Sequence, residues 1–173
     1  MHTVKASDLK TVRFRDKGTP ADNLSNYDSS KEQIIYVAPM SLIEKSRLVF
    51  VTAEGLVKLT EGQELVSTKR TVASTKLGDN DRLILVSLEG GMEQIVLQTS
   101  GGAFLRFPLP EISLMKKNAA GTKGIRMKDG ESVEHAYLLE SRTECMIEHR
   151  GKPFSLSKVK LGKRGGVGVR PRG

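Results

Sequence analysis

Short apolar runs with a period of two residues recur along this chain, and turn signals separate them. Val49 and Val51 alternate with less apolar neighbours before a turn at residues 53–55, and the alternation continues after the turn. The same arrangement surrounds residues 100–102, which read Ser-Gly-Gly. Side chains of a strand point to alternate faces and glycine supports tight turns, so both patterns predict β-hairpins.

Helical patterning is nearly absent. Only residues 40–46 and 110–115 have short helical character, and without caps they are typical of connectors. The chain is therefore predicted to be all-β.

The hairpins recur at a fixed spacing. Residues 48–55 are similar to residues 95–102, 47 positions later, and residues 145–151 form a weaker third copy. Glycine-containing stretches close these units at residues 17–20, 120–126 and 164–170. Four short strands per unit and a period near 50 residues are typical of propeller blades. We expect one domain over residues 1–173, with approximate units at 1–28 (a partial blade), 29–78, 79–128 and 129–173.

These repeats resemble the C-terminal domain of the A subunits of bacterial type IIA topoisomerases, DNA gyrase and topoisomerase IV. Residues 48–59 and 95–112 are similar to the hairpin that opens a blade, and residues 117–127 and 16–24 to the loop and strand that close one. The resemblance covers nearly the whole chain. It implies a β-pinwheel, a propeller-like disc whose strands swap between neighbouring blades and around whose basic perimeter duplex DNA bends.

The sequence also departs from this family. Such domains carry four to six blades, whereas three units and a fragment are visible here. The arginine expected four residues after the hairpin glycine is present as Arg106, but Leu59 and Ser155 replace it in the other two units. The resemblance therefore implies a phosphate contact at Arg106 and not at those two positions.

A glycine-rich segment near the C-terminus resembles the Q-R-R-G-G-K-G box of the gyrase members of this family. Residues 162–168 read G-K-R-G-G-V-G and keep its central arginine and both following glycines. The box belongs to the first blade of the family, whereas this segment lies in the last unit. Two interpretations remain open: a functional box, or the ordinary closing loop of a blade. The sequence does not decide between gyrase and topoisomerase IV.

Charge is distributed very unevenly. The chain has a formal charge of +8, yet the residues up to Glu148 contain 20 basic and 20 acidic side chains. The last 25 residues contain eight basic side chains and no acidic one. A cationic segment of this kind favours a polyanionic partner such as nucleic acid. The repeat places the segment inside a blade, which argues against a disordered tail.

Basic residues and glycines of the closing segments are the candidate DNA contacts, because Lys and Arg neutralise phosphates and exposed glycine loops offer backbone N–H donors. The candidates are Arg106, Lys116, Lys117, Lys123, Arg126, Lys128, Lys158, Lys160, Lys163, Arg164, Gly165, Gly166 and Arg170. Lys69, Arg70 and Lys76 are weaker candidates. No recognition helix is visible, so contacts to the DNA backbone and DNA bending are expected in place of sequence readout.

Enzymatic and metal chemistry find little support. Cys145 is the single cysteine, and with His149 it makes half of a zinc site at most. Tyr27, Tyr36 and Tyr137 lie in blade sequence, so none is assigned the DNA-cleaving role. We therefore expect no catalytic site, metal or cofactor on this chain.

Location and partners follow from the same reading. No stretch approaches the roughly 20 apolar residues of a membrane helix, and the N-terminus does not read as a signal peptide, so a cytoplasmic location is expected. The expected partners are duplex DNA, the rest of the topoisomerase A chain and its B chain. The alternative is a propeller that serves as a protein-interaction scaffold, with its basic edge binding an acidic partner.

Overall fold

The computed structural model describes residues 1–141 and 143–171, so Arg172, one of the eight C-terminal cations, lies outside the described residues. Two antiparallel sheets form its centre, and each is built on a predicted hairpin. Strands β1 (Arg47–Thr52) and β2 (Leu56–Glu61) form the first hairpin, and β4 (Gln94–Thr99) and β5 (Phe104–Pro108) form the second. Gly55 and Gly102 adopt φ of 77° and 73° in the turns, a conformation that costs glycine little.

Each hairpin acquires its outer strands from later in the chain. The first sheet has the order β3-β1-β2-β6, with β3 at Leu83–Leu88 and β6 at Thr122–Lys123. The second has the order β5-β4-β7, with β7 at Val133–Leu139. Along the chain, β3 precedes and β6 follows the β4–β5 hairpin, which belongs to the other sheet. This exchange of strands makes the sheets cross the limits of the sequence units, which themselves remain a prediction.

The 47-residue repeat is confirmed by matching bridges in the two sheets. Val57 pairs with Thr122 in the first, and Phe104 pairs with Val169 in the second. Arg106 likewise makes a parallel bridge to Leu161, as Leu59 does to Leu114. Segment 161–169 thus closes the second sheet, and the cations it carries belong to a blade.

The remaining elements are short. Strands β8 (Met146–His149) and β9 (Lys152–Ser155) form a two-stranded hairpin. The one α-helix of the described residues, α1 (Met40–Ile43), and the 3-10 helix η4 (Leu109–Glu111) occupy the two segments predicted as connectors. The other 3-10 helices are η1 (Ala6–Asp8), η2 (Ala21–Asn23), η3 (Gly62–Leu65) and η5 (Leu156–Lys158). The all-β prediction is confirmed. Within the described residues, no helix is long and apolar enough to cross a bilayer.

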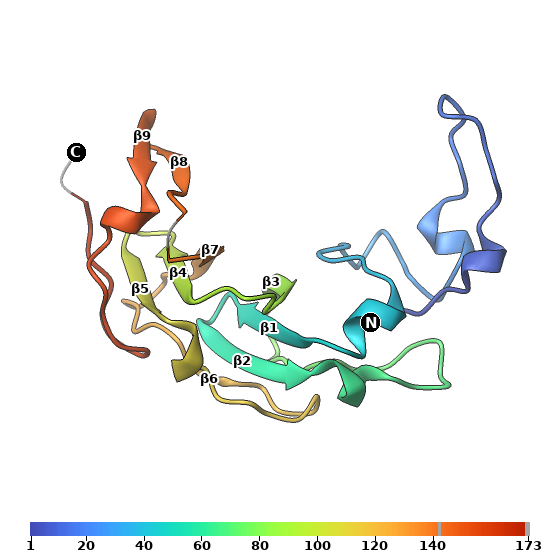
Figure 1. Cartoon of the computed structure of the whole chain (residues 1–173), viewed down its shortest axis with the longest axis horizontal. Helices are drawn as coiled ribbons and strands as arrows, with labels where there is room; N and C mark the ends of the chain where they lie inside the picture. The colour runs from blue at the N-terminus through green and yellow to red at the C-terminus, as the bar shows by residue number, and fades with distance from the viewer. Residues whose placement is uncertain (142, 172–173) are drawn as a thin grey trace.

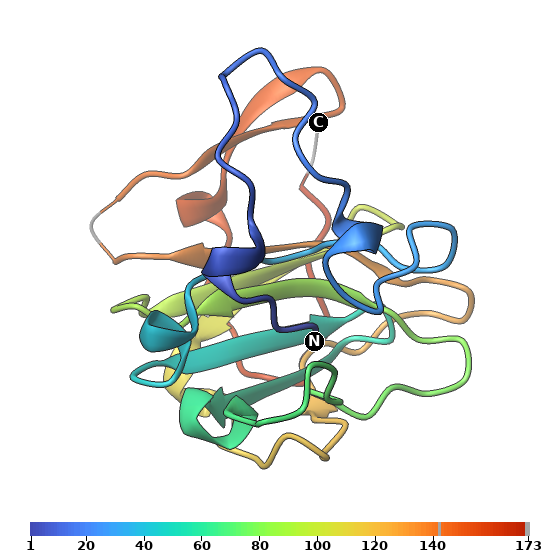
Figure 2. The same cartoon turned by 90° about the vertical axis from the view of Figure 1, so that its right-hand side faces the viewer.

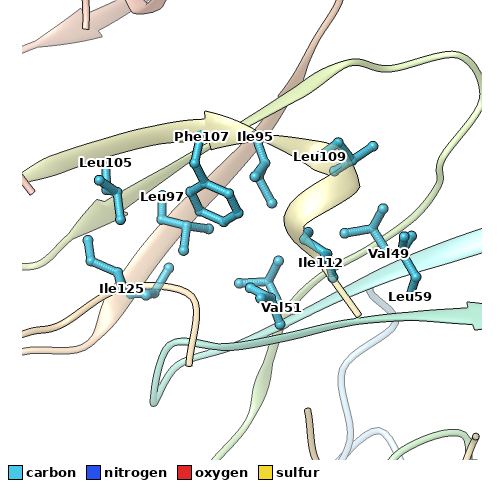
Figure 3. Close-up of a cluster of buried hydrophobic side chains, with 12 residues drawn as sticks. Val49, Val51, Leu59, Ile95, Leu97, Leu105, Phe107, Leu109, Ile112 and Ile125 are labelled. Atoms are coloured by element: carbon cyan, nitrogen blue, oxygen red, sulfur yellow. The ribbon is translucent and has the colours of Figure 1, made fainter. Parts of the chain in front are cut away.

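The main core lies between the two sheets, because strand residues alternate between faces. Val49, Val51 and Leu59 point from the first sheet toward Ile95 and Phe107 of the second, and all five are buried (Figure 3). The opposite face of the first sheet packs on α1 and η3, and the opposite face of the second packs on the β8–β9 hairpin. Successive sheets are thus stacked face to face, as blades are.

The stacked blades follow an open arc. The N-terminal segment rises at one end of the arc and the β8–β9 hairpin at the other (Figure 1). Residues 9–18 form a long loop that projects from the body (dark blue in Figure 2). The closing segments, residues 114–127 and 161–169, run along the convex edge (Figure 1).

Candidate nucleic-acid interface

Three of the four-residue turns in the described residues share a leading cation and a following glycine. The amide N–H of the fourth residue donates to the carbonyl of the first in 13–16, 116–119 and 163–166, at N···O distances of 2.9, 3.0 and 3.1 Å. We call these the closing turns. Each begins with a cation: Arg13, Lys116 and Lys163. A glycine follows two residues after each turn, at Gly18, Gly121 and Gly168.

Two of these turns belong to closing segments that lie side by side. The amide of Gly165 donates to the carbonyl of Gly124 at 2.7 Å, and that of Arg126 donates to the carbonyl of Gly166 at 2.8 Å. The basic residues of both segments therefore share one edge of the arc. This combined edge, residues 114–128 and 158–170, is the candidate DNA surface.

Most predicted contacts on this surface are available to a ligand. Seven of the predicted side chains are exposed, and within the described part of the chain none of them forms a side-chain hydrogen bond or ion pair: Lys116, Lys123, Arg126, Lys128, Lys158, Lys160 and Lys163. Lys117 is half-buried. Because cations without a carboxylate partner retain their full attraction for phosphate, these residues fit a polyanion.

Three predicted arginines instead bind the protein itself. The Nε of Arg106 donates to Gln94 Oε1 at 2.7 Å, and its Nη1 donates to the carbonyls of Ser157 and Val159. In the same way, the Nε of Arg170 donates to the Gly101 carbonyl at 2.9 Å, and its Nη2 forms an ion pair with Glu131 at 2.7 Å.

Arg164 makes the most extensive of these connections. Its Nε donates to the Glu111 carbonyl at 2.7 Å and its Nη1 to the Lys123 carbonyl at 2.9 Å, while its backbone N–H donates to Glu111 Oε2 at 2.7 Å. Arg164 therefore joins its own closing turn to η4 and β6. The three arginines tie blades and closing segments together, and each has part of its five-donor guanidinium committed to that task.

The glycines of the box-like segment serve packing. The amides of Gly165 and Gly166 already donate to Gly124 and Lys163, so these two donors, which the sequence offers to phosphate, are occupied within the protein. A Cβ on Gly168 would lie 3.1 Å from the Ala103 Cβ and from the Phe104 carbonyl carbon. Glycine is thus required for the segment to approach β5 closely. The geometry matches a blade-closing loop equivalent to residues 116–121.

The weaker candidates lie toward the N-terminal end of the arc. Lys69 and Arg70 are exposed on the loop after η3, beside the segment that begins at Met1. Lys76 is exposed next to the closing turn 116–119, where its amide donates to the Ala119 carbonyl at 3.4 Å.

Two further groups of residues belong to these structures although the sequence did not single them out. Arg13 and Arg15 are exposed on the first closing turn, with the fully exposed Phe14 between them, and Lys17 is exposed directly after the turn. The signal was present, because residues 16–24 already resembled a blade-closing loop. Lys58 is the second omission. It is completely buried in β2 and carries no sequence signal, since Leu105 stands at the equivalent position of the next repeat.

The residues that the sequence offered for zinc binding or catalysis pack against, or hydrogen-bond to, other parts of the protein. Cys145 packs against the cluster beside the β8–β9 hairpin, and the His149 ring lies edge-on to Phe104 with centroids 5.0 Å apart. Tyr27 donates to the Glu32 carbonyl and Tyr137 to Gln98 Oε1. Throughout residues 1–141 and 143–171, no three His, Cys, Asp or Glu side chains gather as a metal site would need.

Comparisons with solved structures support the arrangement of blades. The C-terminal domain of DNA topoisomerase IV superposes with a TM-score of 0.80 at 27% identity, over 92% of this chain and 51% of that chain. The C-terminal domain of E. coli ParC gives a TM-score of 0.64 at 21% identity, over 75% of this chain and 57% of that one. At these levels of identity, the second comparison speaks to the fold alone.

Comparison of sequences also finds relatives among type IIA topoisomerase A chains. The chain is 25% identical to the DNA gyrase A protein of Staphylococcus epidermidis over 177 aligned positions, which cover 98% of this chain and 20% of that protein. It therefore spans about one fifth of the length of these curated relatives. The sequence pattern described as DNA gyrase C-terminal domain, beta-propeller, matches residues 46–88 and 93–140. With the repeat, the strand exchange and the stacked blades, this match shows that the chain belongs to the DNA gyrase C-terminal domain family of β-pinwheels.

Proposed function

We propose that this chain is a duplex DNA-binding and DNA-bending module of the A chain of a type IIA topoisomerase. The observation that carries the proposal is the candidate DNA surface, where seven exposed cations without protein partners in the described residues lie on or beside the closing segments that run along the convex edge of an arc. A convex basic edge can contact successive phosphates only if the duplex curves around it. Bending is therefore part of the proposal.

The chemistry of the surface favours binding without sequence preference. Lysine and arginine on turns reach phosphate oxygens, which are the same for every base pair. The described residues contain no helix long enough to read a major groove, since α1 has four residues. Specificity would come from how easily a given duplex bends.

The module would act together with other parts of a larger enzyme. In this proposal it holds a DNA segment for strand passage, while cleavage and ATP-driven steps occur on the rest of the topoisomerase A chain and on the B chain. The module needs no catalytic residue or cofactor of its own, and it works in the cytoplasm, where the chromosome is.

A salt series tests the proposal. Gel shifts with duplexes of about 30 and about 100 base pairs should show binding at low salt that is tighter for the longer duplex. If all seven free cations reach phosphates, log Kd should change with log salt with a slope of about 6, since each contact contributes about 0.9.

Two results would contradict the proposal. One is no binding of the longer duplex at low salt. The other is binding of an acidic polypeptide such as polyglutamate as tight as that of DNA, which would favour the scaffold hypothesis.

A further inference from the structure

Lys58 is a buried cation on the face of the first sheet that points away from the main core. Its side chain is completely buried, and its ammonium lies 4.9 Å from the centroid of the Phe50 ring on the adjacent strand. The positive charge of the Lys58 ammonium therefore lies in the protein interior, against an aromatic ring. Such a charge needs strong local partners.

The partners are backbone carbonyls of two other segments. The Lys58 Nζ donates to the carbonyls of Lys117 and Ala119 at 3.0 Å each, to Ser74 at 3.1 Å and to Lys116 at 3.4 Å. Three of these four acceptors belong to the closing turn 116–119. The ammonium therefore connects β2 directly to a turn about 60 residues later in the chain.

No carboxylate shares the site. Across the described residues, Lys58 forms no ion pair, and the charged side chains of the segments that supply its acceptors are Lys76, Lys116 and Lys117, which are all cationic. The charged residues of Lys58's own strand and of the two flanking strands are Glu61 at the end of β2, Arg47 on β1 and Lys123 on β6. The carbonyl dipoles and the Phe50 ring compensate the buried charge in place of a carboxylate, so their geometry decides whether the ammonium is tolerated.

The next blade holds its equivalent turn by different means. Leu105 replaces Lys58, 47 residues later, and its Cδ1 lies 3.1 Å from a Cβ built on Gly162 and 3.6 Å from one built on Gly166. Apolar contact with glycines therefore substitutes for the ammonium. Turn 116–119 reads Lys-Lys-Asn-Ala, without glycine, and the Lys58 ammonium instead supplies three hydrogen bonds to its carbonyls.

We infer that Lys58 is a positioning residue for DNA binding: its buried ammonium fixes the closing turn 116–119 so that the lysines of this turn are presented at the candidate DNA surface. This inference deepens the proposed function and rests on it. An anchored turn loses little conformational entropy when phosphate binds, whereas a released turn must be ordered by the DNA.

The test uses Lys58→Met, which keeps the length of the side chain and removes the charge. Lys45→Met is the matched control, because Lys45 is exposed beyond α1 and lies outside the candidate DNA surface. Thr75→Val is a milder second variant: the Thr75 hydroxyl donates to the Ala119 carbonyl at 3.2 Å, so its loss loosens the same turn without a change of charge.

Two measurements are made on each variant after circular dichroism has shown that it is folded. Limited trypsin digestion reports whether the turn is released, because trypsin cleaves after Lys116 and Lys117. Gel shifts over a salt series report the number of phosphate contacts. We expect faster cleavage at these two lysines in Lys58→Met, a smaller increase in Thr75→Val and none in Lys45→Met.

The DNA measurement should change in parallel. Loss of the Lys116 contact would lower the salt slope of Lys58→Met by about 0.9 and would weaken affinity about eightfold at about 0.1 M salt. A side chain that only stabilises the blade would lower the melting temperature and leave the salt slope intact.

The outcomes separate the two proposals. If the unmodified chain does not bind duplex DNA, the proposed function fails and this inference fails with it. If the unmodified chain binds, but Lys58→Met keeps the same salt slope and the same trypsin pattern, only the inference is overturned. If Lys58→Met does not fold, Thr75→Val decides, and unchanged cleavage at the turn overturns the inference.

Discussion

The role of Arg164 gives the sharpest prediction about this interface, because the sequence and the structure suggest different tasks for it. By sequence it is the arginine of a box-like segment and a candidate DNA contact. In the structure its guanidinium donates to the carbonyls of Glu111 and Lys123. We therefore predict that Arg164→Ala lowers the stability of the domain, whereas Lys163→Ala, one residue earlier, does not.

The magnitude follows from the two side-chain hydrogen bonds. Each contributes about 1 kcal/mol, below the range of about 1.5–3 kcal/mol for charged groups, because the guanidinium is half exposed and water can replace it. The expected loss is about 2 kcal/mol of unfolding free energy. For a chain of this length that corresponds to a drop of about 4–8 °C in Tm. Lys163 has an exposed side chain, so its variant should stay within about 0.5 kcal/mol of the unmodified chain.

Thermal unfolding followed by circular dichroism measures both variants under the same buffer conditions. A Tm of Arg164→Ala that equals that of Lys163→Ala would refute the reasoning. It would mean that the two carbonyls are satisfied equally well by water, and that the arginine is free to contact DNA.

Three further predictions concern other parts of the molecule. Arg13→Ala should lower the salt slope of DNA binding by about 0.9, because Arg13 begins the first closing turn and is exposed; an unchanged slope in gel shifts would remove that turn from the interface. Gly62→Ala should cost about 3 kcal/mol or more in urea unfolding, since its Cβ would lie 1.7 Å from the Ile43 carbonyl oxygen; Gly78→Ala, with its nearest atom at 3.7 Å, is the control, and equal stabilities would contradict the packing. Burial lowers the pKa of Lys58 from 10.5 to about 8, so the unfolded chain binds more protons between these values, and the free energy of unfolding should rise as pH increases from about 8 to 10.5. Urea unfolding across this pH window should show the rise in the unmodified chain, and an equal rise in Lys58→Met would assign it to other groups.

The strands and their repeat could be predicted because they depend on local patterns. Alternating apolar residues around Gly55 and Gly102 fix the hairpins, and their 47-residue spacing fixes the bridges that close each sheet. The sequence also located the basic closing segments. Predicting the hairpins, their repeat and the basic closing segments requires only the order of residue types along the chain.

The division of the cations into free and internally bonded groups could not be predicted. Arg106, Arg164 and Lys58 bind carbonyl oxygens of segments between 41 and 61 residues away, apart from the nearer Ser74. Every residue has a backbone carbonyl, so the identity of the acceptor residue gives no signal in the sequence. Only the three-dimensional arrangement of the blades shows which cations are already occupied.

The central claim is that the convex basic edge binds and bends duplex DNA. Energy transfer between dyes at the two ends of a duplex of about 30 base pairs tests it most directly, because a duplex of this length, about 100 Å at about 3.4 Å per base pair, is far shorter than the persistence length and stays nearly straight when free. The unmodified chain should raise the transfer efficiency at low salt, and the triple variant Lys116→Glu, Lys123→Glu and Lys163→Glu should abolish the rise. An undiminished rise with the folded triple variant would contradict the claim.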